Sequence, residues 1–314
     1  MSEGVAAGVM PAVAEARIAA LDTRRKLQLT LGALWLLDGL LQYQPAMFSR
    51  TFPQMLAATA AGNPGPVAAP ITWSATFIGQ HLAISNGAFA AIQVALGLAI
   101  AFRPVVKLAL AASVLWSCAV WWLGEGLGGV LTGNASPLNG APGAVILYAL
   151  LAILLWPADR DVTAPFIAGR AVGRHPARLA WLVVWGSLAA FALMPASRAP
   201  HGMSAMLATM ARRQPAWVAW VGTHTASVLA GHGLAASIVL ATALSAVAVG
   251  GYLPGRSAKP AIAVAITLAV MIWLAEGIGG IFTGAATDPN SGPLLGLLAL
   301  AYWPVSRARH EGTR

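Results

Sequence analysis

The chain has 314 residues, of which 58% are hydrophobic and only 9% are charged, and its mean hydropathy is +0.72. Soluble domains carry about 25% charged residues, so this composition excludes an ordinary soluble domain and predicts a multi-pass membrane protein. The net charge is +9, but the basic residues lie in short patches between apolar runs, which argues against a nucleic-acid partner. With Cys118 as its single cysteine, the chain cannot form an intrachain disulfide, a cysteine metal cluster or a c-type haem attachment.

Eight apolar segments predict an all-α polytopic membrane protein. They lie at 28–46, 72–101, 104–123, 141–157, 179–195, 216–250, 259–275 and 292–304. The second and sixth are long enough to tilt or to project beyond the lipid, whereas the fourth and eighth are short. Residues 1–27 lack the order of a cleaved signal peptide, because Arg24, Arg25 and Lys26 precede the first apolar run, so we expect a cytoplasmic N-terminal tail.

The distribution of basic residues predicts the orientation. If the N-terminus is cytoplasmic, 15 of the 19 Lys and Arg residues lie in inner segments and only Arg50, Arg198, Arg212 and Arg213 lie in outer ones. This bias follows the positive-inside rule and places both termini in the cytoplasm, with the protein in the plasma membrane.

Two stretches of the chain are almost identical. Residues 122–133 read WLGEGLGGVLTG and residues 273–284 read WLAEGIGGIFTG, which places Glu125 and Glu276 151 positions apart. Four segments in each half return the chain to its starting side, so we predict two parallel four-helix repeats related by an axis along the membrane normal. The repeats span 28–157 and 179–304, the basic stretch 158–178 is a solvated cytoplasmic linker, and 305–314 is a cytoplasmic tail.

A few polar residues near the outer face form a candidate site. Asp38, Glu125 and Glu276 are the acidic residues expected at helix depth, where a charge is costly and needs a partner or a wet cavity. His81 and His224 lie near the outer starts of the second and sixth segments. His232 follows eight residues after His224, on a broad shared helix face, and His201 lies in the second large outer loop.

Each of these features has two interpretations. The glutamates either cap a helix end within tight glycine packing or line a glycine-rich mouth that binds a cation, a proton or a polar headgroup. His81 and His224, with Glu125 and Glu276, could ligate a metal, or the two histidines a b-type haem, but for each histidine alone a hydrogen bond to a carbonyl oxygen is the favoured interpretation. The segment HGMSAMLATM at 201–210 offers soft sulfur ligands for Cu(I), but its spacing favours a helix on the membrane surface.

The opening LTLGALWLLDGLLQYQP and the four-span layout of residues 28–157 resemble the DoxX-like family of small membrane proteins, so the whole chain looks like two such units fused. The patterns WWxGEGxGGxxTG and SPxxGAPGA, at 121–133 and 136–144, also resemble a group of uncharacterised actinobacterial membrane proteins. The DoxX-like resemblance implies membrane redox chemistry, such as quinone-coupled oxidation of sulfur compounds.

Three functions remain open on the sequence alone. The first is a redox or metal-handling membrane component, in which Asp38 orients one of the proposed ligands and the cofactor is a metal, a haem or a quinone. The second is a transporter of small solutes or lipids built on the parallel repeat. The third is a non-catalytic subunit or scaffold of a membrane complex, whose partners are lipid and other subunits.

Overall fold

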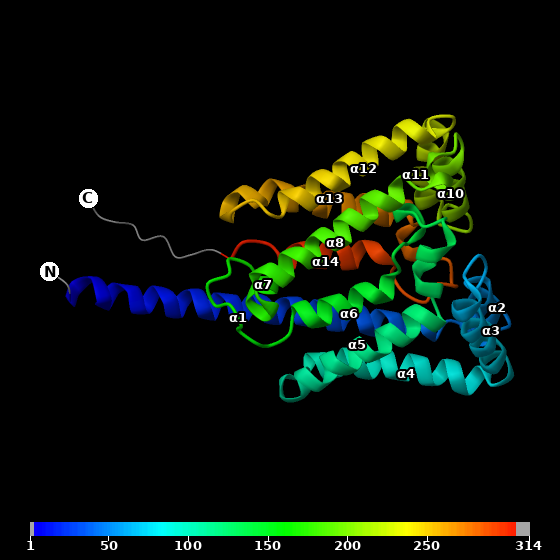
Figure 1. Cartoon of the computed structure of the whole chain (residues 1–314). Coiled ribbons are helices and arrows are strands. Elements are labelled where there is room, and N and C mark those ends of the chain that lie inside the picture. Colours follow the sequence, from blue (N-terminus) through cyan, green and yellow to red (C-terminus); the bar gives the residue numbers. More distant parts are fainter. Residues whose placement is uncertain (1–2, 306–314) are drawn as a thin grey trace.

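The computed structural model describes the backbone of residues 3–305 and the side chains of 19–255 and 257–305. Within this part the regular structure is helical (Figure 1). Residues 306–314 of the predicted C-terminal tail lie outside it.

The first half of the chain forms six α-helices. They are α1 (Glu3–Gln42), α2 (Thr51–Ala58), α3 (Gly65–Gln80), α4 (Leu82–Ala101), α5 (Val106–Leu123) and α6 (Ala144–Leu154). The second half adds α7 (Ile167–Val172), α8 (Arg174–Ala192), α9 (Pro195–Arg198), α10 (Gly202–Met210), α11 (Ala216–Leu229), α12 (Gly233–Gly250), α13 (Lys259–Ala275) and α14 (Ser291–Ala301). Among the described residues, Leu82–Ala101, Arg103–Leu123 and Gly233–Gly250 are long and apolar enough to cross a membrane, consistent with a membrane protein.

Two predicted continuous helices are each broken in two. The expected helix 72–101 is interrupted at His81, and the expected helix 216–250 is interrupted between α11 and α12, where Gly231 has a φ of +80°. Figure 1 shows α2 and α3, and likewise α10 and α11, gathered at one end of the bundle, which we call the capped end. The prediction was wrong because hydropathy stays high through both breaks, so composition does not mark the change of direction.

The short helices α6 and α14 pack against each other in the centre of the molecule. Each has 11 residues, about 16 Å, and is therefore much shorter than the roughly 30 Å hydrocarbon layer. Leu147 and Leu151 of α6 and Leu294 and Leu298 of α14 are buried completely or almost so. A helix that is apolar on all sides is a core helix, and the surrounding helices supply its environment.

Helix α1 packs along α4 through small and amide side chains. A Cβ atom on Gly97 would lie 2.6 Å from the carbonyl oxygen of Gly32, so the two backbones come into direct contact there. Nearer the capped end, the Gln42 amide donates to Asn86 Oδ1, and Asn86 Nδ2 donates to the carbonyl of Gln42 at 2.9 Å. These contacts hold the part of α1 that carries Asp38.

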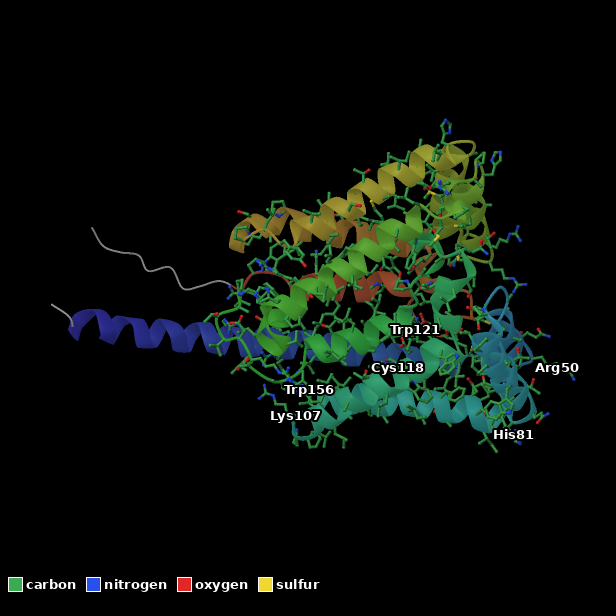
Figure 2. The ribbon with its side chains drawn as sticks, viewed as in Figure 1. Arg50, His81, Lys107, Cys118, Trp121 and Trp156 are labelled. Atoms are coloured by element: carbon green, nitrogen blue, oxygen red, sulfur yellow. The ribbon has the colours of Figure 1, made fainter. Side chains whose placement is uncertain are left out.

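The opposite end of the bundle is rich in arginine, and we call it the arginine end. Arg24, almost fully buried, pairs with Asp159 at 2.6 Å. Arg174 lies 3.5 Å from Asp161, and the hydroxyl of Thr163, followed by the Arg174 charge, holds the pKa of that carboxyl below its usual value. Figure 2 places Lys107 and Trp156 at this end and Arg50 and His81 at the capped end.

The predicted solvated linker at 158–178 is in part a folded element. It contains α7 and the start of α8, and several of its side chains are buried: Ala164, Phe166, Ile167, Ala168, Ala171 and Ala177. The ring of Phe166 stacks on Tyr302 with centroids 5.2 Å apart, so the linker closes the arginine end of the core. Its basic residues suggested full solvation, but the apolar residues between them are buried.

Candidate functional site

Each glutamate of the repeated segments bonds the first turn of the helix that follows it. Glu125, just beyond the end of α5, accepts hydrogen bonds from the backbone N–H of Val145 at 3.1 and 3.3 Å, in the first turn of α6. Glu276, at the end of α13, accepts from the Ser291 hydroxyl and from the Gly292 N–H at 3.4 Å, in the first turn of α14. A carboxyl group there meets unpaired N–H groups at the positive end of the helix. Both glutamates therefore have the contacts of the capping interpretation.

The glycines after each glutamate form a left-handed turn. Four consecutive residues have positive φ in each segment: Gly126, Leu127, Gly128 and Gly129 between 57° and 69°, and Gly277, Ile278, Gly279 and Gly280 between 55° and 68°. Because this conformation costs a side-chain-bearing residue about 1–2 kcal/mol, glycine fills three of the four positions. The turn reverses the chain after α5 and α13 and brings the glutamate over the next helix.

The two segments differ in the register of their tryptophans. Alignment of the two repeated segments pairs Trp122 with Trp273. In the structure, however, the residue equivalent to Trp273 is Trp121. The Trp121 indole donates to Pro142 O at 2.7 Å, just as the Trp273 indole donates to Pro289 O at 2.9 Å. The cause is one extra residue in the last turn of α5. There the Glu125 N–H bonds the carbonyl of Val120, five residues back, whereas the Glu276 N–H bonds Ile272, four residues back.

This register predicts unequal effects for two neighbouring substitutions. We expect Trp121→Phe to lower the free energy of unfolding by about 1 kcal/mol, because Pro142 O loses its donor. Trp122→Phe should change it by less than about 0.5 kcal/mol, because Trp122 is 45% exposed and its indole has no such contact. Thermal unfolding in detergent, followed by circular dichroism, compares the two. A larger loss from Trp122→Phe would contradict the register.

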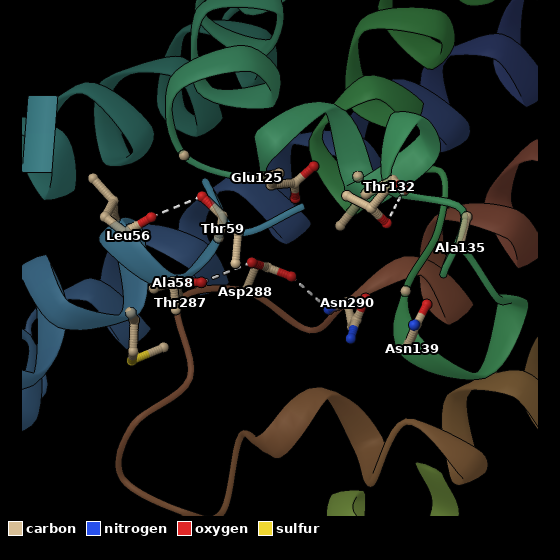
Figure 3. A pocket seen from close by; sticks show the side chains of 18 of the residues that line it. Leu56, Ala58, Thr59, Glu125, Thr132, Ala135, Asn139, Thr287, Asp288 and Asn290 are labelled. Atoms are coloured by element: carbon tan, nitrogen blue, oxygen red, sulfur yellow. Dashed lines mark hydrogen bonds between the residues drawn. The ribbon is translucent and has the colours of Figure 1, made fainter. Parts of the chain in front are cut away.

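A pocket of about 650 Å³ lies at the capped end between the two halves. The first half contributes residues of α2 and of the segment 124–144, and the second contributes Met210 and the loop before α14. Its polar side chains are those of Thr59, Glu125, Thr132, Asn134, Asn139, Thr287, Asp288 and Asn290, most of which Figure 3 labels. Glu276 does not line it. Since Glu125 comes from one half and Asp288 from the other, the pocket needs both.

Asp288 is held by its own loop. Its Oδ1 accepts from the Asn290 N–H at 2.7 Å and its Oδ2 from the Thr287 hydroxyl at 2.8 Å, as Figure 3 shows. The corresponding loop of the first half has Ala141 at this place, counted back from the start of α6. The acidic group is therefore present in one half only. Sequence reasoning missed Asp288, and its sole signal was the turn sequence Thr-Asp-Pro-Asn.

The two carboxyl groups that line the pocket, those of Glu125 and Asp288, have no positively charged partner among its described lining residues. Burial raises the pKa of Asp288 above its usual value, and burial followed by the Asp288 charge raises that of Glu125 well above its own. The Val145 N–H opposes the shift at Glu125. Among the residues that the structure describes, no Lys, Arg or His lines the pocket, and the ion pairs join other residues. Two carboxyls in one pocket without a cation favour retention of a proton.

The histidines lie elsewhere on the molecule. His81 precedes α4 and is exposed, with Nδ1 3.1 Å from Phe77 O. His232 precedes α12 in the same way, with Nδ1 2.9 Å from Ala230 O, so it is His232 rather than His224 that matches His81, at the interval of 151 that separates the glutamates. His224 lies within α11, where its ring stacks on Trp220 with centroids 5.2 Å apart. His201 precedes α10 and is exposed.

The predicted metal ligands are not brought together. Across the residues that the structure describes, no group of three or more His, Cys, Asp or Glu side chains could hold a metal ion. The segment 201–210 forms the predicted helix α10, with Met203 buried against the protein.

Asp38 lies beneath the capped end on α1 and is 1% exposed. Its neighbours include Tyr148 of α6, and the charges of Glu125 and Asp288 act on it. It is not part of the pocket lining, and its expected role of orienting one of the proposed ligands stays a prediction.

No family model, no curated protein and no solved structure matches this chain.

Proposed function

We propose that the chain is an eight-segment membrane protein of two parallel repeats that binds a small organic cation, a protonated or quaternary amine, in the pocket at the capped end. The observation that carries the proposal is the pairing of Glu125 and Asp288, one from each half, in a cavity that no basic side chain of the described residues lines. Buried charges are otherwise paired, so a pocket with two unpaired carboxyls favours an occupant of positive charge.

The size and lining of the pocket favour an organic cation over a bare metal ion. Its volume of about 650 Å³ lies within the roughly 300–1,000 Å³ of typical small-molecule sites. Thr59, Asn139 and Asn290 add neutral polar groups that suit an ammonium group and its substituents. A metal ion needs several ligands within about 2–2.6 Å, and only two carboxyls line the cavity.

The arrangement of basic residues supports an outward-facing pocket. Most Lys and Arg residues belong to segments at the arginine end (Figure 1), and by the positive-inside rule this distribution favours a capped end that faces the outside of the cell. From there the cation could be a free amine or the amine of a lipid headgroup, which share the same ammonium chemistry.

The test is direct binding to purified protein in lipid nanodiscs. Ethanolamine hydrochloride, choline chloride and calcium chloride are titrated calorimetrically, in phosphatidylglycerol discs and in discs containing phosphatidylethanolamine. We expect the amines to bind, and Glu125→Gln and Asp288→Asn each to weaken binding at least about 10-fold, the effect of losing one charged contact. Competition by the phosphatidylethanolamine discs indicates a lipid headgroup, and its absence a free solute.

Asp22→Asn is the matched control, because it removes the same charge from an exposed carboxyl at the other end of the molecule. It should leave binding unchanged. Failure of both amines to bind, binding of calcium alone, or an equal loss in Asp22→Asn would overturn the proposal.

A further inference from the structure

Asp38 is a buried acid without a full set of partners. It lies on α1 with 1% of its surface exposed, and its Oδ1 has no hydrogen-bond partner among the described residues. The hydroxyl of Tyr148 lies beside it but forms no hydrogen bond of normal geometry, and it has no other described partner. A carboxylate in such surroundings would be strongly destabilised, so the acid is stable there only with a proton or a nearby cation.

The surroundings of Asp38 lead toward the pocket. Trp35, one turn before Asp38 on α1, packs on Tyr148 of α6 with ring centroids 4.2 Å apart. Tyr148 lies one turn after Val145, whose N–H binds Glu125 at 3.1 Å. The charges of Glu125 and Asp288 both act on Asp38. Helices α4 and α14, which also pack on α1, contain no titratable residue, and α7, which packs on α1 as well, contains Arg170. Asp38 is thus the inner member of a group of three carboxyls whose outer members line the pocket.

Three buried carboxyls whose charges act on one another cannot all be ionised in an empty pocket, since like charges in a poorly solvated region repel strongly. A cation between Glu125 and Asp288 changes this balance, because it stabilises the ionised forms of all three. The three carboxyls then titrate together, and the number of protons that they bind depends on whether the cation is present.

We propose that Asp38 is the proton-holding residue of the pocket, so that binding of a cation at Glu125 and Asp288 releases a proton from Asp38 through the pocket to water. The exchange balances in charge, because one positive ion enters and one proton leaves. This inference rests on the proposed function, since it requires a cation site at the pocket. It makes Asp38 a positioning and proton-binding residue that does not touch the amine.

The test counts protons released per cation bound. Ethanolamine hydrochloride is titrated into the full-length protein in nanodiscs near pH 7, in two buffers with different ionisation enthalpies. We expect release of about one proton per amine in the wild type. In Asp38→Asn the amine should still bind, and the release should fall at least about twofold. An unchanged proton count in Asp38→Asn overturns the inference, whereas absence of amine binding to the wild type overturns the proposed function itself.

A second measurement covers the case in which Asp38→Asn does not fold. Infrared difference spectra of the wild type, with and without the amine, should show loss of the C=O band of a protonated carboxylic acid. Protein labelled with ¹³C-aspartate should shift that band, and Tyr148→Phe should shift it again, because Tyr148 adjoins Asp38. A band that the aspartate label does not shift belongs to Glu125, and a band that Tyr148→Phe does not shift belongs to Glu125 or Asp288. Either result contradicts the assignment.

Discussion

Gly128→Ala is expected to lower the free energy of unfolding by about 3 kcal/mol or more, whereas Gly133→Ala costs about 1 kcal/mol. Both glycines have positive φ, at 62° and 74°, so both substitutions strain the backbone. They differ in the space that is available for the added methyl group. A Cβ atom on Gly128 would lie 1.9 Å from Pro142 O and 2.2 Å from Pro142 C, while a Cβ on Gly133 meets nothing within 4 Å.

The repeated segment offers the same experiment a second time. Gly279 matches Gly128, with Pro289 C and O both 2.4 Å from an added Cβ, and Gly284 matches Gly133, again with open space. Thermal unfolding midpoints of the four alanine variants in detergent should therefore fall into two pairs. A Gly128→Ala variant as stable as Gly133→Ala would mean that the turn does not lie against the loop before α6.

Glu276→Gln is expected to reduce the protein's loss of stability as the pH rises from 4.5 to about 8. Burial raises the pKa of Glu276 from 4.5 to about 8, against the opposing bonds from Ser291 and Gly292. The folded state thus binds a proton that the unfolded state releases. The resulting stabilisation is complete below pH 4.5 and is lost as the pH rises through 8, with an upper limit of roughly 5 kcal/mol. Glutamine stays neutral, so its contribution does not change over this range.

The measurement is the thermal midpoint between pH 5 and pH 9 for the wild type, Glu276→Gln and Asp22→Asn. The wild type should lose stability between pH 5 and pH 8, and Glu276→Gln should lose clearly less. Asp22→Asn is the matched control, because it removes an exposed carboxyl at the other end of the molecule and leaves Glu276 in place. Parallel curves for the wild type and Glu276→Gln would contradict the raised pKa.

The repeated segments illustrate how much local sequence can predict. The run of glycines after Glu125 and Glu276 indicated a close backbone approach, and a Cβ on Gly128 or Gly279 does meet the facing loop. Capping of a helix end was one of the two interpretations of the glutamates, and both accept N–H groups from a first turn. These features depend on the few residues around them, which is why the sequence could indicate them.

The helix breaks and the tryptophan register illustrate what it could not predict. His81 and Gly231 interrupt segments that remain apolar on both sides, where α3 packs against α2 and α11 packs against α10. The alignment of Trp122 with Trp273 failed because one extra residue in the last turn of α5 shifts the indole that reaches the next loop.

The sequence by itself determined the helical class, the apolar segments, the duplicated turns and the place of the rare acidic residues Asp38, Glu125 and Glu276 among them, because composition and local periodicity govern all of these. Only the tertiary structure decided that Glu276 is sealed against Ser291 while Glu125 lines a pocket, and that the pocket's second carboxyl is Asp288. The physical reason is that burial and proximity across the two halves depend on how distant segments pack. Residues 125 and 288 have no local relationship that a sequence pattern could express.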